Sequence, residues 1–202
     1  MTSPSWADRH ARFYGTRLGQ RVLAAEVGLV LGNLPESGTV ASLGCGVGAH
    51  EAEMARRRPG LRIIGLDPDP DMLRAVPAAL PRTLGDAAAL PFRDGALDAA
   101  VFVTSLEFMD RPDLALAEVA RALRAGGVAI ALAINPGSEW GRARLGPRAT
   151  PWRTADALGR SLAGAMGGEY RSMHALRIEG EHAWPDADPR EAVLLVAWAK
   201  KG

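Results

Sequence analysis

A glycine cluster between a short apolar run and a helix-compatible segment is the feature that most constrains the fold. Residues Val40–Leu43 are mostly apolar, and Gly44, Gly46 and Gly48 follow in the spacing G-x-G-x-G. A second apolar run then ends on Asp67. This order predicts a strand, a tight glycine turn, a helix and a parallel strand that ends on a carboxylate. Glycine permits close backbone approach to a ligand, and an acid at that place accepts hydrogen bonds from ribose hydroxyls, so the pattern is typical of nucleoside binding.

The composition is that of a soluble globular protein. The chain has 202 residues, 48% of them hydrophobic and 23% charged, which is enough for one domain with a substantial core. The net charge of +1 provides no basic surplus for nucleic acid, and apolar stretches such as 127–134 are too short to span a bilayer. The N-terminus lacks the apolar core of a signal peptide. A single cysteine, Cys45, cannot form an intrachain disulfide, so we expect a cytoplasmic protein.

Strand-like and helix-like segments alternate along the chain, which predicts an α/β fold with a Rossmann-like, doubly wound sheet. The last two predicted strands, at 170–178 and 192–199, are too close in sequence for a crossover helix. They therefore predict an antiparallel hairpin that closes the edge of an otherwise parallel seven-stranded sheet. The other predicted strands are 39–43, 61–66, 83–86, 97–103 and 128–134, and the predicted helical segments are 6–34, 50–58, 71–79, 112–123 and 156–166.

Four sequence blocks, in this order, resemble those of a known family. They are residues 43–48, 65–73, 85–92, and 92–106 running on to 118–127. The chain looks like a class I S-adenosylmethionine-dependent methyltransferase, of the type 11 small-molecule branch that includes quinone-biosynthesis enzymes. The resemblance covers roughly residues 40–134 and implies S-adenosyl-L-methionine as cofactor, S-adenosyl-L-homocysteine as product and a small-molecule methyl acceptor.

The resemblance also implies an organisation within a single domain over residues 1–202. We expect an N-terminal helical lid at 1–38 and a cofactor-binding core at 39–134. Residues 135–202 would then supply a substrate-side segment and the C-terminal hairpin. The expected partner is a small molecule, with neither nucleic acid nor membrane, and the chain is expected to be a monomer or a homodimer.

The four blocks assign cofactor-binding roles residue by residue. The glycine loop would lie beneath the methionine part, Asp67 would hold the ribose, and Asp86 with Ala87 would form the adenine corner. Asp86 could equally be a turn residue and Met72 a core methionine. From the lid, Tyr14 is predicted to touch the methionine part, or equally to be an aromatic packed beneath an amphipathic helix. The other predicted cofactor-binding residues are Gly44, Cys45, Gly46, Gly48, Asp67, Pro68, Met72, Asp86, Ala87, Thr104 and Ser105.

One position departs from the family pattern. The family carries an acid two residues before the first glycine, and this chain has Ser42 there. A carboxylate at that place supports the charged amino end of the cofactor. Serine can form a hydrogen bond but supplies no charge, so we expect either weaker cofactor binding or another partner for the ammonium group.

No constellation in the sequence identifies a catalytic base. The methyl group of a sulfonium is already activated, so the protein must mainly align the acceptor and exclude water for an in-line displacement. A base is needed only if the acceptor loses a proton, and the candidates are His10, Tyr14 and Glu107. The histidines show no metal-ligand spacing, so no metal site is expected.

Acceptor specificity is expected from the lid and from residues 135–153. Aromatic and arginine side chains there could bind an anionic or planar acceptor, or could simply form a solvated face. They are Trp140, Arg142, Arg144, Arg148, Trp152 and Arg153.

Two other function classes stay open. A dinucleotide-dependent oxidoreductase would share the fold, but the G-x-G-x-G spacing and the predicted C-terminal hairpin count against it. A non-catalytic protein could keep the cofactor site as a scaffold, since Ser42 replaces the acid and no base is evident. A nucleic-acid methyltransferase is disfavoured by the charge and by Thr104–Glu107, which stands where amino-methylating enzymes carry an Asn/Asp-Pro-Pro-aromatic motif.

Overall fold

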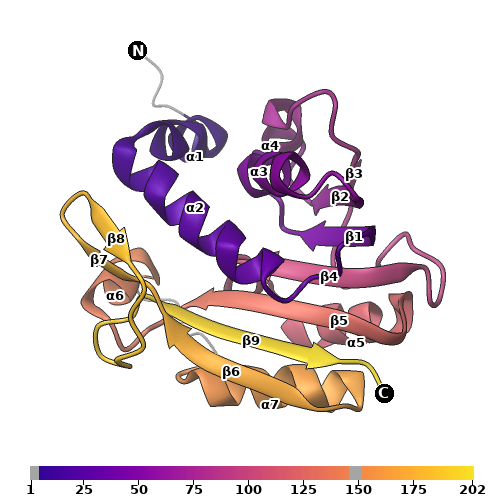
Figure 1. Ribbon diagram of the computed structural model, residues 1–202. Helices are drawn as coiled ribbons and strands as arrows, with labels where there is room; N and C mark the ends of the chain where they lie inside the picture. Colours follow the sequence, from indigo (N-terminus) through magenta and orange to yellow (C-terminus); the bar gives the residue numbers. More distant parts are fainter. Residues whose placement is uncertain (1–4, 146–151) are drawn as a thin grey trace.

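The computed structural model describes residues 5–145 and 152–202, and a seven-stranded sheet forms its centre. The strand order is β3-β2-β1-β4-β5-β9-β6 (Figure 1). Of these seven strands, β9 runs antiparallel to both of its neighbours, and the other pairs are parallel. The predicted doubly wound α/β fold, with a mostly parallel sheet and an antiparallel C-terminal strand, is confirmed. The strands are β1 (Gly38–Leu43), β2 (Leu61–Asp67), β3 (Arg82–Leu84), β4 (Leu97–Val103), β5 (Leu123–Ile134), β6 (Tyr170–Ala175) and β9 (Leu194–Lys200).

Helices cover both faces of this sheet. On one face lie α2 (Arg17–Leu31) and α3 (Ala49–Arg57), and on the other lie α5 (Pro112–Ala122) and α7 (Ala155–Met166) (Figure 1). None of the helices in the described part of the chain is long and apolar enough to cross a membrane.

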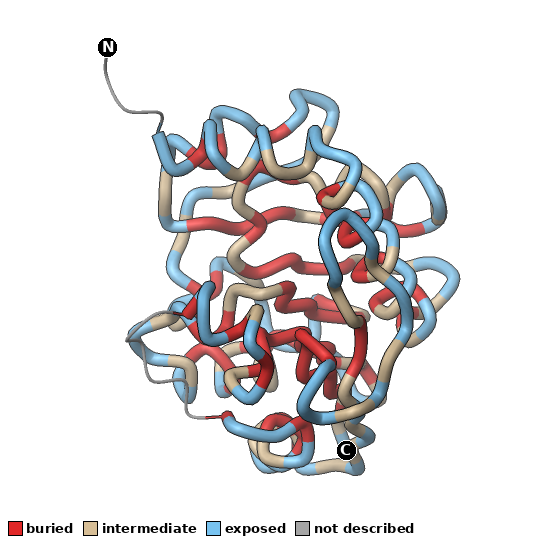
Figure 2. Tube along the Cα trace, turned by 90° about the vertical axis from the view of Figure 1, so that its left-hand side faces the viewer, coloured by how far each residue is buried: buried red, intermediate tan, exposed pale blue. Residues whose placement is uncertain are grey.

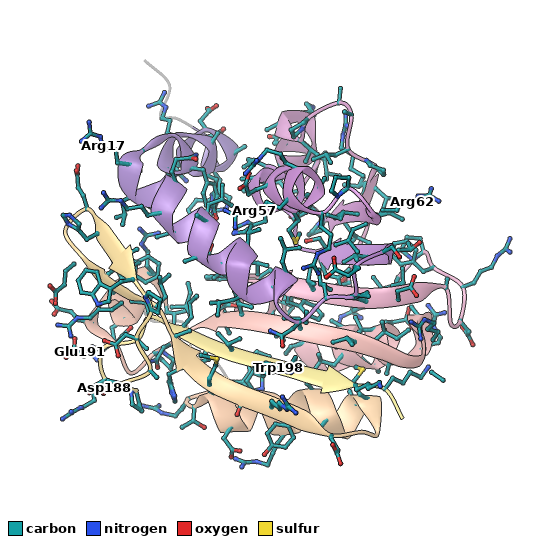
Figure 3. The ribbon with its side chains drawn as sticks, in the orientation of Figure 1. Arg17, Arg57, Arg62, Asp188, Glu191 and Trp198 are labelled. Carbon is teal, nitrogen blue, oxygen red and sulfur yellow. The ribbon has the colours of Figure 1, made fainter. Side chains whose placement is uncertain are left out.

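Arginine side chains are spread over different elements, and Arg17, for example, points away from the fold (Figure 3).

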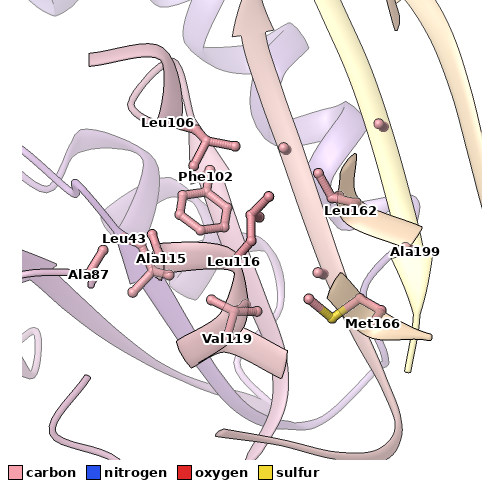
Figure 4. Packing of buried hydrophobic residues seen from close by; sticks show 14 of the residues in the cluster. Leu43, Ala87, Phe102, Leu106, Ala115, Leu116, Val119, Leu162, Met166 and Ala199 are labelled. Atoms are coloured by element: carbon pink, nitrogen blue, oxygen red, sulfur yellow. The ribbon is translucent and has the colours of Figure 1, made fainter. Parts of the chain in front are cut away.

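The central strands are buried on both faces. In β5, Ile130 and Leu132 belong to the hydrophobic cluster under α2 and α3, whereas Ala129 and Ala131 belong to the cluster under α5 and α7. This alternation has the period of two that a strand imposes. Figure 2 shows the buried residues running through the centre of the molecule, and Figure 4 shows the second cluster around Phe102. The nearly all-apolar segment 97–103, interrupted only by Asp98, is likewise a strand that is covered from both sides.

The N-terminal helical segment resolves into two helices. α1 (Trp6–Gly15) ends at Thr16, whose extended backbone breaks the helix and whose hydroxyl accepts a hydrogen bond from the Gly19 backbone N–H at 3.0 Å. The two helices meet closely, since an added Cβ at Gly19 would lie 1.9 Å from the Phe13 carbonyl oxygen. Thr16 thus caps α2 and turns α1 over the sheet edge.

Four further elements differ from the sequence pattern. α4 (Pro70–Ala75) is shorter than the predicted 71–79 because Val76 is already extended before Pro77. The stretch after β5, predicted to be irregular, contains α6 (Glu139–Leu145). The predicted strand 170–178 breaks at Leu176, whose φ is +66°, and a separate hairpin follows. Its strands are β7 (Arg177–Glu179) and β8 (His182–Trp184).

The topology marks one edge of the sheet as a binding edge. The chain runs outward from β1 through β2 to β3 and then returns to the other side of β1 as β4. Open α/β sheets bind ligands outside the carboxyl ends of their strands at such a switch point. The glycine cluster, Asp67 and Thr104 all lie at the carboxyl ends of β1, β2 and β4.

Candidate functional site

A cavity of about 540 Å³ opens at this edge, beneath α1. Its wall combines the glycine loop, the end of β2, the turn after β3, the end of β4 and one face of α1. Of the predicted cofactor-binding residues, Gly48 does not line the cavity. Those that do are Tyr14, Gly44, Cys45, Gly46, Asp67, Pro68, Met72, Asp86, Ala87, Thr104 and Ser105.

The three glycines of the loop have different reasons to be glycine. All have positive φ, but a Cβ on Gly44 would lie 2.5 Å from the Ser105 Cβ, and one on Gly48 would lie 2.9 Å from Val76. At Gly46 the nearest atom to an added Cβ is the Met72 sulfur at 4.0 Å. Gly44 and Gly48 are therefore required by packing, whereas Gly46 keeps space open in the cavity.

Asp67 is held in place by the backbone around it. Its Oδ2 accepts a hydrogen bond from the Gly46 N–H at 2.8 Å, and its Oδ1 accepts one from the Asp69 N–H at 2.9 Å. Each carboxylate oxygen can accept a further hydrogen bond. The acid therefore fixes the glycine loop and can still accept hydrogen bonds from ligand hydroxyls.

The opposite corner of the cavity is closed by an ion pair. Asp86 accepts a hydrogen bond from the Ala88 N–H, and its Oδ2 lies 2.7 Å from an Arg111 guanidinium nitrogen. The Ala88 N–H and the Arg111 charge both lower the pKa of Asp86. Arg111 lies just before α5 and also lines the cavity. No sequence motif pointed to Arg111, because this contact joins segments that are distant along the chain.

The end of β4 has a strained backbone. Thr104 has a φ of +47°, which is rare for a β-branched residue, and its N–H donates to the Leu132 carbonyl at 2.7 Å. The Ser105 hydroxyl donates to the Leu43 carbonyl at 2.6 Å and so ties β4 to β1. Backbone strain of this kind costs on the order of 1–3 kcal/mol and is concentrated at functional sites.

One face of α1 forms the aromatic side of the cavity. Trp6, His10 and Tyr14 recur at helical spacing of four and all line it. The Trp6 and His10 rings are 4.5 Å apart, and Tyr14 meets His50 at 5.3 Å. Burial raises the pKa of Tyr14, and nearby carboxylates raise it further, so the phenol stays protonated. Sequence reasoning named His10 and Tyr14 and missed Trp6, which the same spacing could have indicated.

Glu107 does not line the cavity. It is buried in the short 3-10 turn η1 (Leu106–Phe108), where its Oε1 accepts a hydrogen bond from the Ile134 N–H at 2.8 Å. Burial raises its pKa to about 7. The geometry indicates that Glu107 ties η1 to the end of β5.

The aromatic and arginine residues after β5 do not line the cavity in the described part of the chain. The Arg144 guanidinium lies 4.2 Å over the Trp140 ring. Trp152 is buried, and its indole N–H donates to the Ser161 hydroxyl at 2.8 Å. Arg142 and Arg153 are exposed, and Arg148 lies outside the described residues.

Two buried polar pairs lie behind the glycine loop. The Ser42 hydroxyl donates to Glu51 Oε1 on α3, and His50 Nε2 lies 2.7 Å from Glu26 Oε2 on α2. Burial lowers the pKa of His50, but the carboxylates of Glu26 and Glu51 outweigh this effect, and the net change is upward. Burial raises the pKa of Cys45, so its thiol is not activated. Within 5–145 and 152–202, no group of three or more histidine, cysteine, aspartate or glutamate residues could hold a metal ion.

Comparison with known proteins identifies the family. The sequence profile of the family described as a methyltransferase domain matches residues 41–131. Trans-aconitate 2-methyltransferase from Azoarcus is 30% identical over 203 residues, which cover 98% of this chain and 79% of that protein. The chain belongs to the S-adenosylmethionine-dependent methyltransferases. The resemblance carried by the four sequence blocks is thereby confirmed.

Other relatives agree in family and fold. An uncharacterized methyltransferase from Mycobacterium bovis is 40% identical over 91 residues, but that match spans 44% of this chain and 36% of the relative. A methyltransferase from Thermotoga maritima, described as a possible histamine N-methyltransferase, shares the fold with a TM-score of 0.80 at 19% identity, covering 98% of this chain and 96% of that one. A geranyl diphosphate C-methyltransferase from Streptomyces coelicolor, solved with S-adenosyl-L-homocysteine, has a TM-score of 0.63 at 16% identity, covering 91% and 80%.

The residues of this family member fit S-adenosylmethionine. A side chain at Gly46 would project into the cavity, and the carboxylate of Asp67 stands at the switch point with acceptor capacity left. In the described part of the chain, Glu51 Oε2 is buried without a hydrogen-bond partner, close to the loop. The site therefore offers open space beside a carboxylate that can still accept hydrogen bonds, which is compatible with a ligand that carries hydroxyl groups.

Proposed function

We propose that this protein transfers a methyl group from S-adenosylmethionine to a small-molecule acceptor by in-line displacement. The observation that carries the proposal is the cavity at the switch point, where Gly46 leaves space beside the fixed carboxylate of Asp67 and beneath the aromatic face of α1. Family membership supports the cofactor. The cytoplasmic location and the monomeric or homodimeric state remain predictions.

The protein's contribution is to bind and to orient. When bound, S-adenosylmethionine supplies a methyl group activated by a sulfonium. Asp67 would accept hydrogen bonds from the ribose hydroxyls, and Ala87 with Asp86 would border the adenine. Arg111 holds Asp86 in position at this corner. Contacts to the adenosine part of the cofactor would fix the orientation of its methyl group, and with it the direction from which the acceptor must approach.

We infer that the acceptor enters between α1 and η1 and is apolar or planar. Trp6 and Phe108 line the cavity and remain 57% and 39% exposed, so they offer apolar surface at its opening. The cavity is also acidic, since Asp69 and Asp110 line it together with Asp67 and Asp86. Among the described residues of its wall, the arginine is Arg111, which already pairs with Asp86. An anionic acceptor is therefore disfavoured.

His10 is the group we assign as base for acceptors that lose a proton. Its Nδ1 lies 3.2 Å from the Trp6 carbonyl oxygen, which can only accept a hydrogen bond. The proton of the neutral ring therefore sits on Nδ1, and Nε2 is left with a lone pair. Neither Tyr14, which stays protonated, nor Glu107, which lies away from the cavity, has this capacity.

Two measurements test the proposal. Calorimetric titration should show binding of S-adenosyl-L-homocysteine and not of NADH, and incubation with labelled S-adenosylmethionine and a matched cell extract should label a small molecule. Binding without labelling of any acceptor would favour the alternative of a non-catalytic cofactor-binding protein. Binding of NADH in place of S-adenosyl-L-homocysteine would favour the oxidoreductase.

A further inference from the structure

Behind the glycine loop lies a polar cluster of the half-buried Tyr14 and the buried residues Glu26, Ser42, His50 and Glu51. Its members come from α1, α2, β1 and α3. Glu26 pairs with His50 at 2.7 Å, and the Ser42 hydroxyl donates to Glu51 Oε1. Within the described chain, the other carboxylate oxygen, Glu51 Oε2, has no hydrogen-bond partner. Glu51 as a whole is only 2% exposed.

An unpartnered carboxylate oxygen is costly in the interior. A buried acceptor without a hydrogen-bond partner has lost its contact with water and gained nothing in exchange, and this cost is larger for a charged group. The neighbouring His50 does not remove this cost: its Nε2 is paired with Glu26, and Glu51 Oε2 accepts no hydrogen bond from the described residues. A cation brought to Glu51 by a ligand would supply the missing partner.

Glu51 lies behind the cavity wall, not among the residues that line it, and its charge acts on residues of that wall. Two residues of the cavity wall, Tyr14 and Cys45, have pKa values raised first by burial and then in part by the negative charge of Glu51. His50, its neighbour on α3, lines the same wall. Burial raises the pKa of Glu51, so its carboxylate form needs a nearby positive charge to be stabilised. The cluster has two carboxyl groups and one imidazole, which leaves room for a positively charged ligand group.

We propose that Glu51 supplies the negative charge that binds the ammonium group at the amino-acid end of the cofactor. The inference rests on the family's cofactor and goes beyond it, since Glu51 is on α3 and the family's usual acid belongs at the position of Ser42. Ser42 then has a defined function: its hydroxyl donates to Oε1 and orients the carboxylate so that Oε2 is left for the ligand.

The affinities for two nucleosides distinguish loss of the interaction between Glu51 and the ammonium group from a structural disturbance of the whole site. S-adenosyl-L-homocysteine carries the ammonium group, whereas methylthioadenosine shares its adenosine and sulfur but lacks the amino-acid end. In the Glu51→Gln variant we expect affinity for S-adenosyl-L-homocysteine to fall on the order of 10- to 100-fold, the usual loss for a charged hydrogen-bond partner. Affinity for methylthioadenosine should stay within about twofold of wild type, because the substituted glutamine keeps the volume and the acceptor for Ser42.

Two further variants make the test specific. Glu53→Gln, on the same helix, removes a carboxylate that pairs with Arg56 and Arg57 at the surface, and it should leave both affinities unchanged. Ser42→Asp combined with Glu51→Gln returns a carboxylate to the pair from the β1 side and should restore binding of S-adenosyl-L-homocysteine.

Different results would contradict the role of Glu51 and the proposed function. Unchanged affinity of Glu51→Gln for S-adenosyl-L-homocysteine, or an equal loss for both nucleosides, would overturn the role of Glu51. Wild-type protein that binds neither nucleoside would instead overturn the proposed function itself, so the two failures are distinguishable.

Discussion

The buried carboxyl of Glu107 makes stability depend on pH in a direction opposite to that of a salt-bridged acid. Burial raises its pKa from 4.5 to about 7, although the Ile134 N–H and its own backbone N–H lower it. In the unfolded chain the group ionises near its ordinary value, so between these two pH values the unfolded state gives up the proton more readily than the folded state. The contribution of Glu107 to stability is therefore complete at low pH and is lost as the pH rises through about 7.

The magnitude follows from the shift. A change from 4.5 to about 7 corresponds, at about 1.36 kcal/mol per pKa unit, to a loss of about 3 kcal/mol above the upper value. Glu107→Gln is neutral at every pH and keeps an oxygen that can accept from the Ile134 N–H. The variant should therefore lose less stability than wild type as the pH rises, with the difference growing by about 3 kcal/mol between about pH 4 and pH 8.

Urea unfolding at several pH values in that window measures this difference directly. The pH slope is the quantity to compare, because the unsatisfied amide of glutamine adds an offset that does not depend on pH. Glu36→Gln is a matched control, since the Glu36 side chain is 88% exposed and its removal should leave the pH slope unchanged. Parallel loss of stability in wild type and Glu107→Gln would refute the claim that burial of this carboxyl is what costs stability.

Three other changes probe the site. Asp67→Ala should weaken S-adenosyl-L-homocysteine binding in calorimetry by on the order of 1–3 kcal/mol, and an unchanged dissociation constant would contradict the ribose assignment. Gly46→Ala should lower the free energy of unfolding by about 1–2 kcal/mol because the residue has a positive φ. It should also lower the affinity for S-adenosyl-L-homocysteine at least about tenfold, since the added Cβ enters the cavity. His10→Gln should lower kcat about 100-fold or more for an acceptor that loses a proton, with S-adenosyl-L-homocysteine affinity preserved; an unaffected kcat would remove His10 as the base.

Much of the sheet could be predicted because its strands are buried on both faces. The apolar run 97–103 coincides with β4, and the alternating clusters along β5 explain why such runs contain few polar residues. Local exceptions were harder to predict. The break at Thr16 was missed because the apolar spacing lies in α2, and in the more polar segment of α1 before it a single glycine, Gly15, does not by itself mark a helix end. α6 lies in a stretch where glycine and proline predicted irregular structure. These boundaries depend on a single capping side chain or on tertiary packing.

For the site, sequence reasoning identified backbone-determined positions better than side-chain partnerships. The loop glycines and Asp67 belong to one continuous motif, so their placement at the edge of the sheet follows from the order of strand, turn and helix. Gly48 is the exception. The space that a side chain at Gly48 would take is filled by Val76, which follows α4, and Gly48 does not line the cavity. Arg111 was missed because its contact with Asp86 depends on how separate loops converge.

The position before the glycine loop shows why one motif residue cannot be interpreted alone. The sequence shows that Ser42 replaces a charged residue, and it predicts either weaker cofactor binding or another partner for the ammonium group. In the fold the same serine is buried against Glu51, nine positions later, and it occupies one carboxylate oxygen while the other is unpaired. The charge is then displaced from a strand to the adjoining helix rather than removed. A strand acid and a helix acid at this place would repel each other in a buried site, so a hydroxyl is the residue that lets the helix carboxylate approach. The serine at position 42 and the buried carboxyl group of Glu51 therefore depend on each other, and we expect neither to occur without the other.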